Sequence, residues 1–177
     1  MLKTIGVVAL LLAVAAAAIV AYAATRPDTF LVARSASIKA PPDKIFPLIN
    51  DLRRMNSWNP FVLNDPKVEG SYSGPTSGKG AAYDFEGDKS GSGRIEIQDT
   101  APPRRVTLRL AMIKPFHADN SIEFSLDPAG DTTSVTWAMT GGVPLLAKVV
   151  CLFIDMDKMV GKNFEDGLAN LKAIAEK

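Results

Sequence analysis

The sequence has very little of the residue types that build metal centres and disulfide scaffolds. It contains one cysteine, Cys151, and one histidine, His117. One cysteine cannot form an intrachain disulfide, and this pair cannot supply the usual zinc ligand sets. We therefore expect no structural disulfide and no metal site. His117 lies in a loop-like stretch before a strand pattern, which favours a solvent-facing residue over a general base.

Charge is also sparse and balanced. The 177 residues include 20 Lys or Arg and 19 Asp or Glu, which gives a net charge of +1, and no long basic cluster is present. Nucleic-acid backbones bind concentrated Lys and Arg, so this composition argues against a nucleic-acid partner. The sequence also lacks a nucleophile elbow, a P-loop and a dinucleotide-binding fingerprint. We therefore expect no cofactor.

One long apolar run stands at the N-terminus. Ile5 to Ala24 is twenty residues without a charge, preceded by Lys3 and followed by Arg26. At about 1.5 Å per residue, a helix of this length spans the roughly 30 Å hydrocarbon layer of a bilayer. Residues 5–24 are therefore predicted to be a membrane anchor. Lys3 would hold the N-terminus inside, so that the rest of the chain faces outward.

The same run can also be interpreted as a cleaved signal peptide. Ala21-Tyr22-Ala23 fits the small-x-small rule for signal peptidase. Secretory apolar regions have about 7–15 residues, and the greater length of this run favours an uncleaved anchor. We expect residues 1–26 to form the anchor and its flank, and residues 27–177 a domain facing the bacterial periplasm. The alternative is a domain secreted after cleavage.

The C-terminal segment from Leu145 to Glu176 shows helical periodicity. Its apolar residues recur every three or four positions, at Val149, Leu152, Phe153, Met156, Val160, Phe164, Leu168 and Leu171. A straight helix over this span would reach ~48 Å, too long for so small a domain. We expect a break between Asp155 and Gly161, with the second half packed on the domain. Cys151 is expected to be a small buried residue on the apolar side.

Alternating segments precede this helix and predict strands. They cover 29–39, 81–85, 94–99, 105–110, 117–126 and 133–140. Two short helices are expected after the first strand, and the Gly-rich and Ser-rich flanks of 81–85 are expected to be loops. A turn is predicted at 127–131, and Gly141-Gly142 is expected to end the last strand. This order predicts an α+β fold, in which a curved antiparallel sheet of about six or seven strands wraps round the C-terminal helix.

Three stretches carry a family resemblance: APPDKIFPLINDLRRMNSWNPF, TSVTWAMTGG and MDKMVGKNFEDGLANLKAIAEK. Together with the order of elements, they resemble the SRPBCC superfamily of START and Bet v 1-like proteins. The resemblance is specifically to its bacterial polyketide cyclase/dehydrase and lipid transport branch, and it extends over about Phe30 to Lys177. It implies a helix-grip fold and a site for a hydrophobic ligand, without a particular chemistry.

A helix laid across a curved sheet encloses volume, and that volume is a pocket where side chains do not fill it. The residues predicted to line it are Trp58, Phe61, Tyr83, Phe85, Leu108, Leu110, Phe124, Trp137, Met139, Met156, Met159, Val160 and Phe164. Met156 and Met159 would suit varied ligands, because thioether side chains are flexible. Asp84, Glu86 and Glu96 alternate away from the apolar strand faces.

Three functions remain in competition. The first is a membrane-anchored binding or carrier protein for a lipid or another hydrophobic small molecule. The second is a polyketide cyclase-like enzyme, which requires an acidic, His or Tyr group pointing into the cavity. The third is a ligand-free interaction module of the bacterial envelope, which a cavity smaller than about 300 Å³ would favour.

Overall fold

A computed structural model of the chain describes residues 2–177, and the predicted orienting role of the Lys3 side chain lies outside the described residues. The helices are α1 (Leu2–Ala24), α2 (Pro42–Asn50), α3 (Leu52–Asn56), α4 (Pro60–Leu63), α5 (Leu145–Cys151) and α6 (Met156–Ala175). The strands are β1 (Thr29–Ile38), β2 (Glu69–Ser73), β3 (Ala82–Gly87), β4 (Gly91–Ala101), β5 (Arg105–Lys114), β6 (Ala118–Ala129) and β7 (Thr132–Gly142).

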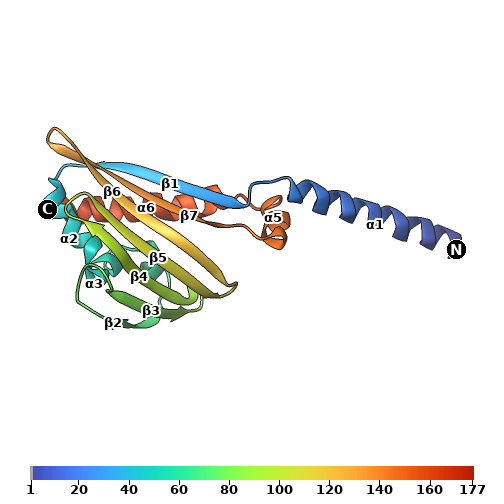
Figure 1. The fold of residues 1–177 in the computed structure, drawn as a ribbon, viewed down its shortest axis with the longest axis horizontal. Coiled ribbons are helices and arrows are strands. Elements are labelled where there is room, and N and C mark those ends of the chain that lie inside the picture. Colours follow the sequence, from blue (N-terminus) through green and yellow to red (C-terminus); the bar gives the residue numbers. More distant parts are fainter. Residues whose placement is uncertain (1) are drawn as a thin grey trace.

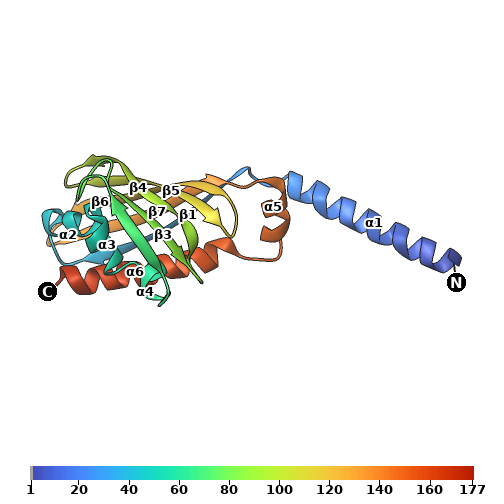
Figure 2. The same ribbon diagram turned by 90° about the horizontal axis from the view of Figure 1, so that it is seen from below.

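The seven strands form one antiparallel sheet in the order β1-β7-β6-β5-β4-β3-β2. From β2 to β7 sequential strands are neighbours, and β1 pairs with the last strand, β7, at the edge opposite β2 (Figure 1). Helix α6 runs along the inner side of the curved sheet (Figure 2). This arrangement confirms the predicted α+β helix-grip fold.

Three short helices follow β1, rather than the predicted two. Asp51 stands in extended backbone between α2 and α3, and its carboxylate accepts from the amide of Arg53 at 2.9 Å. Asn59 begins α4 in the same way, because its side-chain oxygen accepts from the Phe61 amide at 3.1 Å. A capping side chain in extended backbone starts a new helix at each of these positions, so Arg53–Asn56, interpreted from sequence as a connection, is largely helical.

The structure corrects three predictions at glycines. Strand β2 lies within the segment predicted to be a loop, and it pairs with β3 at the sheet edge. A Cβ at Gly70 would clash with the Asp84 carbonyl and the Tyr83 ring, so this strand position requires glycine. Strand β6 continues to Ala129, so the predicted turn is shorter and centres on Gly130, whose φ is +67°. Strand β7 runs through Gly141 and ends at Gly142, so both glycines belong to the strand that they were predicted to stop.

The predicted break in the C-terminal segment is confirmed. Helix α5 ends at Cys151, and α6 begins at Met156 after Asp155, whose carboxylate accepts from the Lys158 amide at 2.9 Å. The predicted apolar stripe is wrong at Phe153, which lies in the non-helical connection and is 76% exposed. Cys151 is half-buried and does not belong to the core. Phe164, Leu168, Leu171 and Ala175 of α6 are buried in the domain core.

The amino end of α6 is fastened to β1 by Arg34. Its guanidinium pairs with Asp157 at 2.8 Å and with Glu165 at 2.9 Å. The hydrogen bonds that Arg34 donates to the carboxylates of Asp157 and Glu165 raise its pKa further above its usual range. A Cβ at Gly161 would occupy the space of the guanidinium, so this glycine permits the close approach. The ion pairs therefore set where α6 starts on the sheet.

Helix α1 extends away from the domain (Figure 1). Residues 4–24 have a mean hydropathy of 2.7, and this helix is long and apolar enough to cross a membrane by length and composition. Near its carboxyl end α1 contacts α5. Lys148 of α5 is buried and donates to the Arg26 carbonyl at 2.8 Å and to Asp28 at 2.5 Å. Lys148 joins α5 to the segment between α1 and β1.

Candidate ligand-binding cavity

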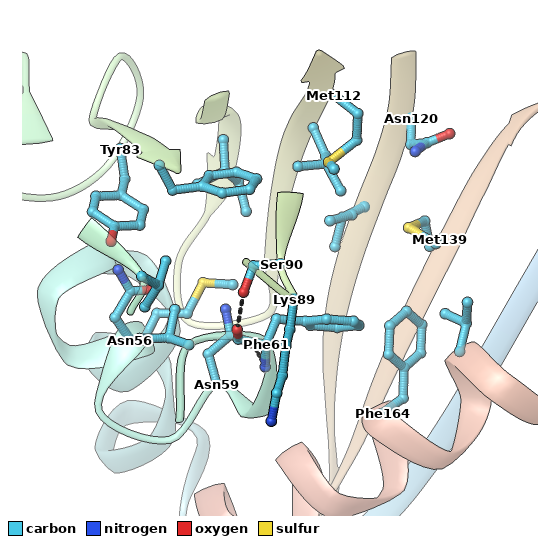
Figure 3. Close-up of a pocket in the computed structure, with 18 of the residues that line it drawn as sticks. Asn56, Asn59, Phe61, Tyr83, Lys89, Ser90, Met112, Asn120, Met139 and Phe164 are labelled. Carbon is cyan, nitrogen blue, oxygen red and sulfur yellow. Dashed lines mark hydrogen bonds between the residues drawn. The ribbon is translucent and has the colours of Figure 1, made fainter. Parts of the chain in front are cut away.

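A cavity of about 360 Å³ lies between the sheet, α4 and the first half of α6. Figure 3 shows side chains from these elements around it. Its wall is mostly apolar, and its volume exceeds the roughly 300 Å³ at the lower limit of small-molecule sites. The complete lining consists of Met55, Asn56, Asn59, Phe61, Val62, Val68, Tyr83, Phe85, Lys89, Ser90, Ile95, Leu110, Met112, Pro115, Asn120, Ile122, Trp137, Met139, Met159, Val160 and Phe164.

Nine of the residues predicted from sequence lie in this wall: Phe61, Tyr83, Phe85, Leu110, Trp137, Met139, Met159, Val160 and Phe164. Contact of these nine with a ligand stays a prediction. The prediction of cavity lining needs correction at Trp58, Leu108, Phe124 and Met156. Trp58, Leu108 and Phe124 are fully buried in the core, and the Trp58 indole N–H donates to the Leu48 carbonyl of α2 at 2.9 Å. Met156, the first residue of α6, is half-buried outside the cavity.

Sequence reasoning missed twelve of the lining residues. Ile95, Met112, Asn120 and Ile122 lie on the same sheet face as Leu110, since cross-strand partners point to the same side. Ile95, Asn120 and Ile122 lie within the strands predicted at 94–99 and 117–126, and extending the alternation of 105–110 by two positions would have found Met112. Pro115, Lys89 and Ser90 lie in turns or their immediate flanks, where the sequence shows no periodicity. They reach the cavity because the β3–β4 and β5–β6 connections fold over its end.

Stacked aromatic rings form the deep side of the cavity. The Trp137 and Phe164 rings stack with centroids 4.2 Å apart and planes 10° apart. Trp58 meets Trp137 edge to face at 5.8 Å from the core side. The Trp137 indole N–H is buried and has no hydrogen-bond partner within residues 2–177. Because large rings in contact hold each other in place, this wall is pre-formed.

Polar groups stand at a few points of the wall. The Asn120 side chain is 8% exposed, and no side-chain hydrogen bond of this residue is found within the described chain. The Ser90 hydroxyl is already committed, since it donates to the Phe61 carbonyl at 2.6 Å (Figure 3). Burial, helped by the neighbouring Tyr72 phenol, raises the pKa of Tyr83, so this phenol is neutral near pH 7. The cavity therefore offers an amide and a phenol to a ligand's polar group.

The turn between β3 and β4 closes one side of the cavity and depends on Asp65. This buried carboxylate accepts from the amides of Ser90 at 2.9 Å, Lys89 at 2.8 Å and Lys67 at 3.2 Å. The Ser90 hydroxyl oxygen lies 2.9 Å from the same carboxylate, so its one proton is shared between Asp65 and the Phe61 carbonyl. These hydrogen bonds, the Ser90 amide first, lower the pKa of Asp65 to about 2.

The lowered pKa of Asp65 predicts that the protein loses stability in acid. A carboxyl whose pKa falls from about 3.9 on folding stabilises the fold fully above that value and less as the pH drops toward 2. We expect Asp65→Asn to be less stable than the original protein at pH 7, because a neutral amide accepts backbone hydrogen bonds more weakly. The difference should shrink between pH 4 and pH 2.5 in urea unfolding. Asp131→Asn, in the exposed β6–β7 turn, is the control. A difference independent of pH would contradict the role given to Asp65.

Comparison with known families shows to which family the chain belongs. Residues 29–176 match the family model described as polyketide cyclase / dehydrase and lipid transport. The chain belongs to this family. It is thereby a member of the SRPBCC superfamily, as the helix-grip architecture indicates. No match was found among curated proteins.

Solved structures share the fold at low sequence identity. Ginseng major latex-like protein 151 from Panax ginseng has a TM-score of 0.64 at 12% identity, with 85% of this chain and 100% of that chain covered. A protein from Chromobacterium violaceum has 0.60 at 15% identity, with 86% and 99% covered. The Aha1 dimer from Colwellia psychrerythraea has 0.59 at 17% identity, with 83% and 96% covered. Similarity at this level establishes the fold alone.

Proposed function

We propose that this protein binds a lipid or another hydrophobic small molecule in the cavity beneath α6. The observation that carries the proposal is an apolar cavity of about 360 Å³ with a pre-formed aromatic wall. Burying an apolar ligand there contributes about 25 cal/mol per Å² of surface removed from water. The volume lies near the lower end for small-molecule sites, which favours a single-chain lipid or a compact ring system.

The ligand is proposed to carry one polar group. The amide of Asn120 lies among apolar neighbours, and a buried polar group is stabilised when it gains a hydrogen-bond partner. An amphiphile would place its polar group near Asn120 or the Tyr83 phenol and its apolar part against Trp137 and Phe164. Because only these few polar contacts select the ligand, the site would accept related molecules that share this pattern of one polar group and an apolar part.

We favour binding over acid–base catalysis. Tyr83 meets the requirement for a Tyr group in the wall, but its raised pKa makes it a poor base near pH 7. Among the described residues that line the cavity there is no Asp, Glu or His. Catalysis through Tyr83 as a proton donor is the second candidate, and conversion of a bound polyketide-like substrate that is lost in Tyr83→Phe would support it.

We further propose that residues 5–24 anchor the protein in the bacterial inner membrane. The proposed division is an anchor with its flank at 1–26 and a periplasmic binding domain at 27–177. The apolar length of α1 and the exposure of its described residues other than Ala23 support this. Cleavage after Ala23, which would release the domain, is the alternative. The intact mass of the protein from cells would decide between them.

Ligand binding is tested with the full chain purified from bacterial membranes in a mild detergent. Native mass spectrometry is expected to find an apolar species of defined mass bound at one copy per protein. The purified protein should also take up a fluorescent fatty acid, with emission shifted to the blue. Repeated recovery of the protein with no bound species, together with no probe uptake, would refute the proposal.

A further inference from the structure

An unusual set of exposed apolar side chains lies around α5 and the β5–β6 turn. We call this set the apolar collar; it comprises Ile113, Phe116, Leu146, Val150, Phe153 and Ile154. Phe116, Leu146 and Phe153 are 79%, 82% and 76% exposed, and the other three are about half exposed. Single exposed apolar residues are ordinary, whereas a group of large ones on adjacent segments marks an interaction surface.

The collar lies at the end of the domain from which α1 emerges. Both views show α5 beside the carboxyl end of α1, and the β5–β6 turn points toward the same end (Figures 1 and 2). Its position relative to α1 is fixed, because Lys148 of α5 binds the Arg26 carbonyl and Asp28. Ala23 of α1 is fully buried at this junction. The α5 part of the collar therefore adjoins the apolar surface of α1.

The cavity opens at the same end. Four of its lining residues are exposed and mark the mouth: Phe61 in α4, Lys89 in the β3–β4 turn, Pro115 in the β5–β6 turn and Met159 in the first turn of α6. Pro115 directly precedes Phe116 of the collar, and Met159 follows Ile154 by five residues. The collar residues consequently stand beside the mouth without lining the cavity.

We propose that the apolar collar inserts into the surface of the bilayer that holds α1, so that the cavity mouth opens onto the membrane. The inference rests on the proposed anchoring by α1. Side chains such as Leu and Phe insert about 5–10 Å into the boundary between headgroups and acyl chains. The two lysines on the collar's own elements are paired, Lys114 of β5 with Glu86 at 2.8 Å and Lys148 of α5 with Asp28. Docking should therefore proceed on uncharged lipid and depend little on salt.

Membrane docking of the collar changes how the ligand reaches the cavity. An apolar molecule in the outer layer of lipid would pass between the collar side chains and the mouth, and its apolar surface would not cross bulk water. The chemical class of the partner is thus a phospholipid surface, and the cargo is an amphiphile already dissolved in it. A second copy of the chain covering the collar is the competing occupant.

Spin labels test the position of the collar. The full chain, in a Cys151→Ser background, is labelled at Phe153→Cys or Phe116→Cys and reconstituted into phosphatidylcholine nanodiscs. Leu12→Cys in α1 reports on the anchor, and Asp131→Cys, in the β6–β7 turn at the opposite end of the domain, is the solvent control. We expect both collar labels to be accessible to oxygen and shielded from a water-soluble nickel complex, like L12C and unlike D131C.

The outcomes separate the two proposals. If L12C is shielded while both collar labels resemble D131C, the anchor stands and the collar proposal is refuted. If L12C itself resembles D131C, the anchoring fails and the collar proposal fails with it. Discs that hold one copy and discs that hold two copies are compared. Collar labels that are open to the nickel complex, together with dipolar broadening between copies in the doubly loaded discs, would assign the surface to a second copy and overturn membrane docking.

A double substitution, Leu146→Ser with Phe153→Ser, tests the consequence for loading. Both side chains are almost fully exposed, so the fold should persist and circular dichroism should be unchanged. We expect uptake of a fluorescent fatty acid from the protein's own bilayer to slow at least about fivefold. Equilibrium binding of the same probe in detergent solution should stay unchanged. Equal loading rates from the bilayer in both proteins would overturn the proposal.

Discussion

Replacing Phe164 with alanine is expected to lower the free energy of unfolding by about 3–5 kcal/mol, the range for large buried aromatic residues. Phe164 is 1% exposed and stacks on Trp137 at 4.2 Å. The substitution removes the contact through which α6 grips the sheet, and the ring's position on the cavity wall prevents neighbouring side chains from filling the space. Urea unfolding of the full chain in detergent micelles, followed by tryptophan fluorescence, measures the loss.

The matched control is Phe153→Ala. It makes the same chemical change at a ring that is 76% exposed, where substitutions usually alter stability by no more than about 0.5 kcal/mol. Equal losses in the two variants would show that α6 does not hold the domain together through Phe164. A ligand carried through purification would stabilise both proteins, so both should be measured after delipidation.

Leu110→Trp is expected to abolish most ligand binding while the fold persists. Leu110 lies in the middle of the cavity wall, paired across the sheet with Ile95 and Asn120. A larger indole there would extend into the cavity and displace the ligand. Losing about 60 Å² of apolar ligand contact costs about 1.5 kcal/mol at about 25 cal/mol per Å², which corresponds to about tenfold in affinity. Titration with a fluorescent fatty acid measures the change.

Leu110→Met is the matched control, because it conserves volume and adapts to its neighbours. It should bind the probe within about threefold of the original protein. In Leu110→Trp, crowding by the larger indole should lower the free energy of unfolding by about 1–3 kcal/mol if the cavity does not accept the ring. Unchanged affinity in a folded Leu110→Trp protein would place the ligand elsewhere and remove the basis of the proposed function.

The parts predictable from the sequence are those with a regular period. Alternation at 105–110 and 133–140 located the central strands, and the spacing of Phe164, Leu168 and Leu171 located the gripping helix. Phe153 was placed on the same stripe because periodicity does not show where hydrogen bonding stops. The Asp155 cap ends that continuity, and an N-cap signal was available there.

Other features depend on contacts between distant segments. Strand β2 contains Gly70 and little apolar character, and it is a strand because it pairs with β3, whose Tyr83 ring approaches Gly70. Trp58 and Phe124 were expected in the cavity because the sequence pattern correctly places both on the side that faces the interior. Which part of an inner face is filled and which stays open depends on how α2 covers one end of the sheet, and no local pattern encodes that. The role of Lys148 is hidden in the sequence for the same reason, since its partners lie about 120 residues away.

The short join between α1 and β1 has a kinetic consequence. Only Thr25 to Asp28 separate the two elements, and Lys148 holds this segment from the side. A domain on a long flexible tether would search a wide volume above its membrane, and its effective concentration at the lipid would fall with tether length. Held this closely, the domain would exchange cargo in a first-order process. Its rate would follow the mole fraction of cargo in the bilayer and would not change with the amount of protein.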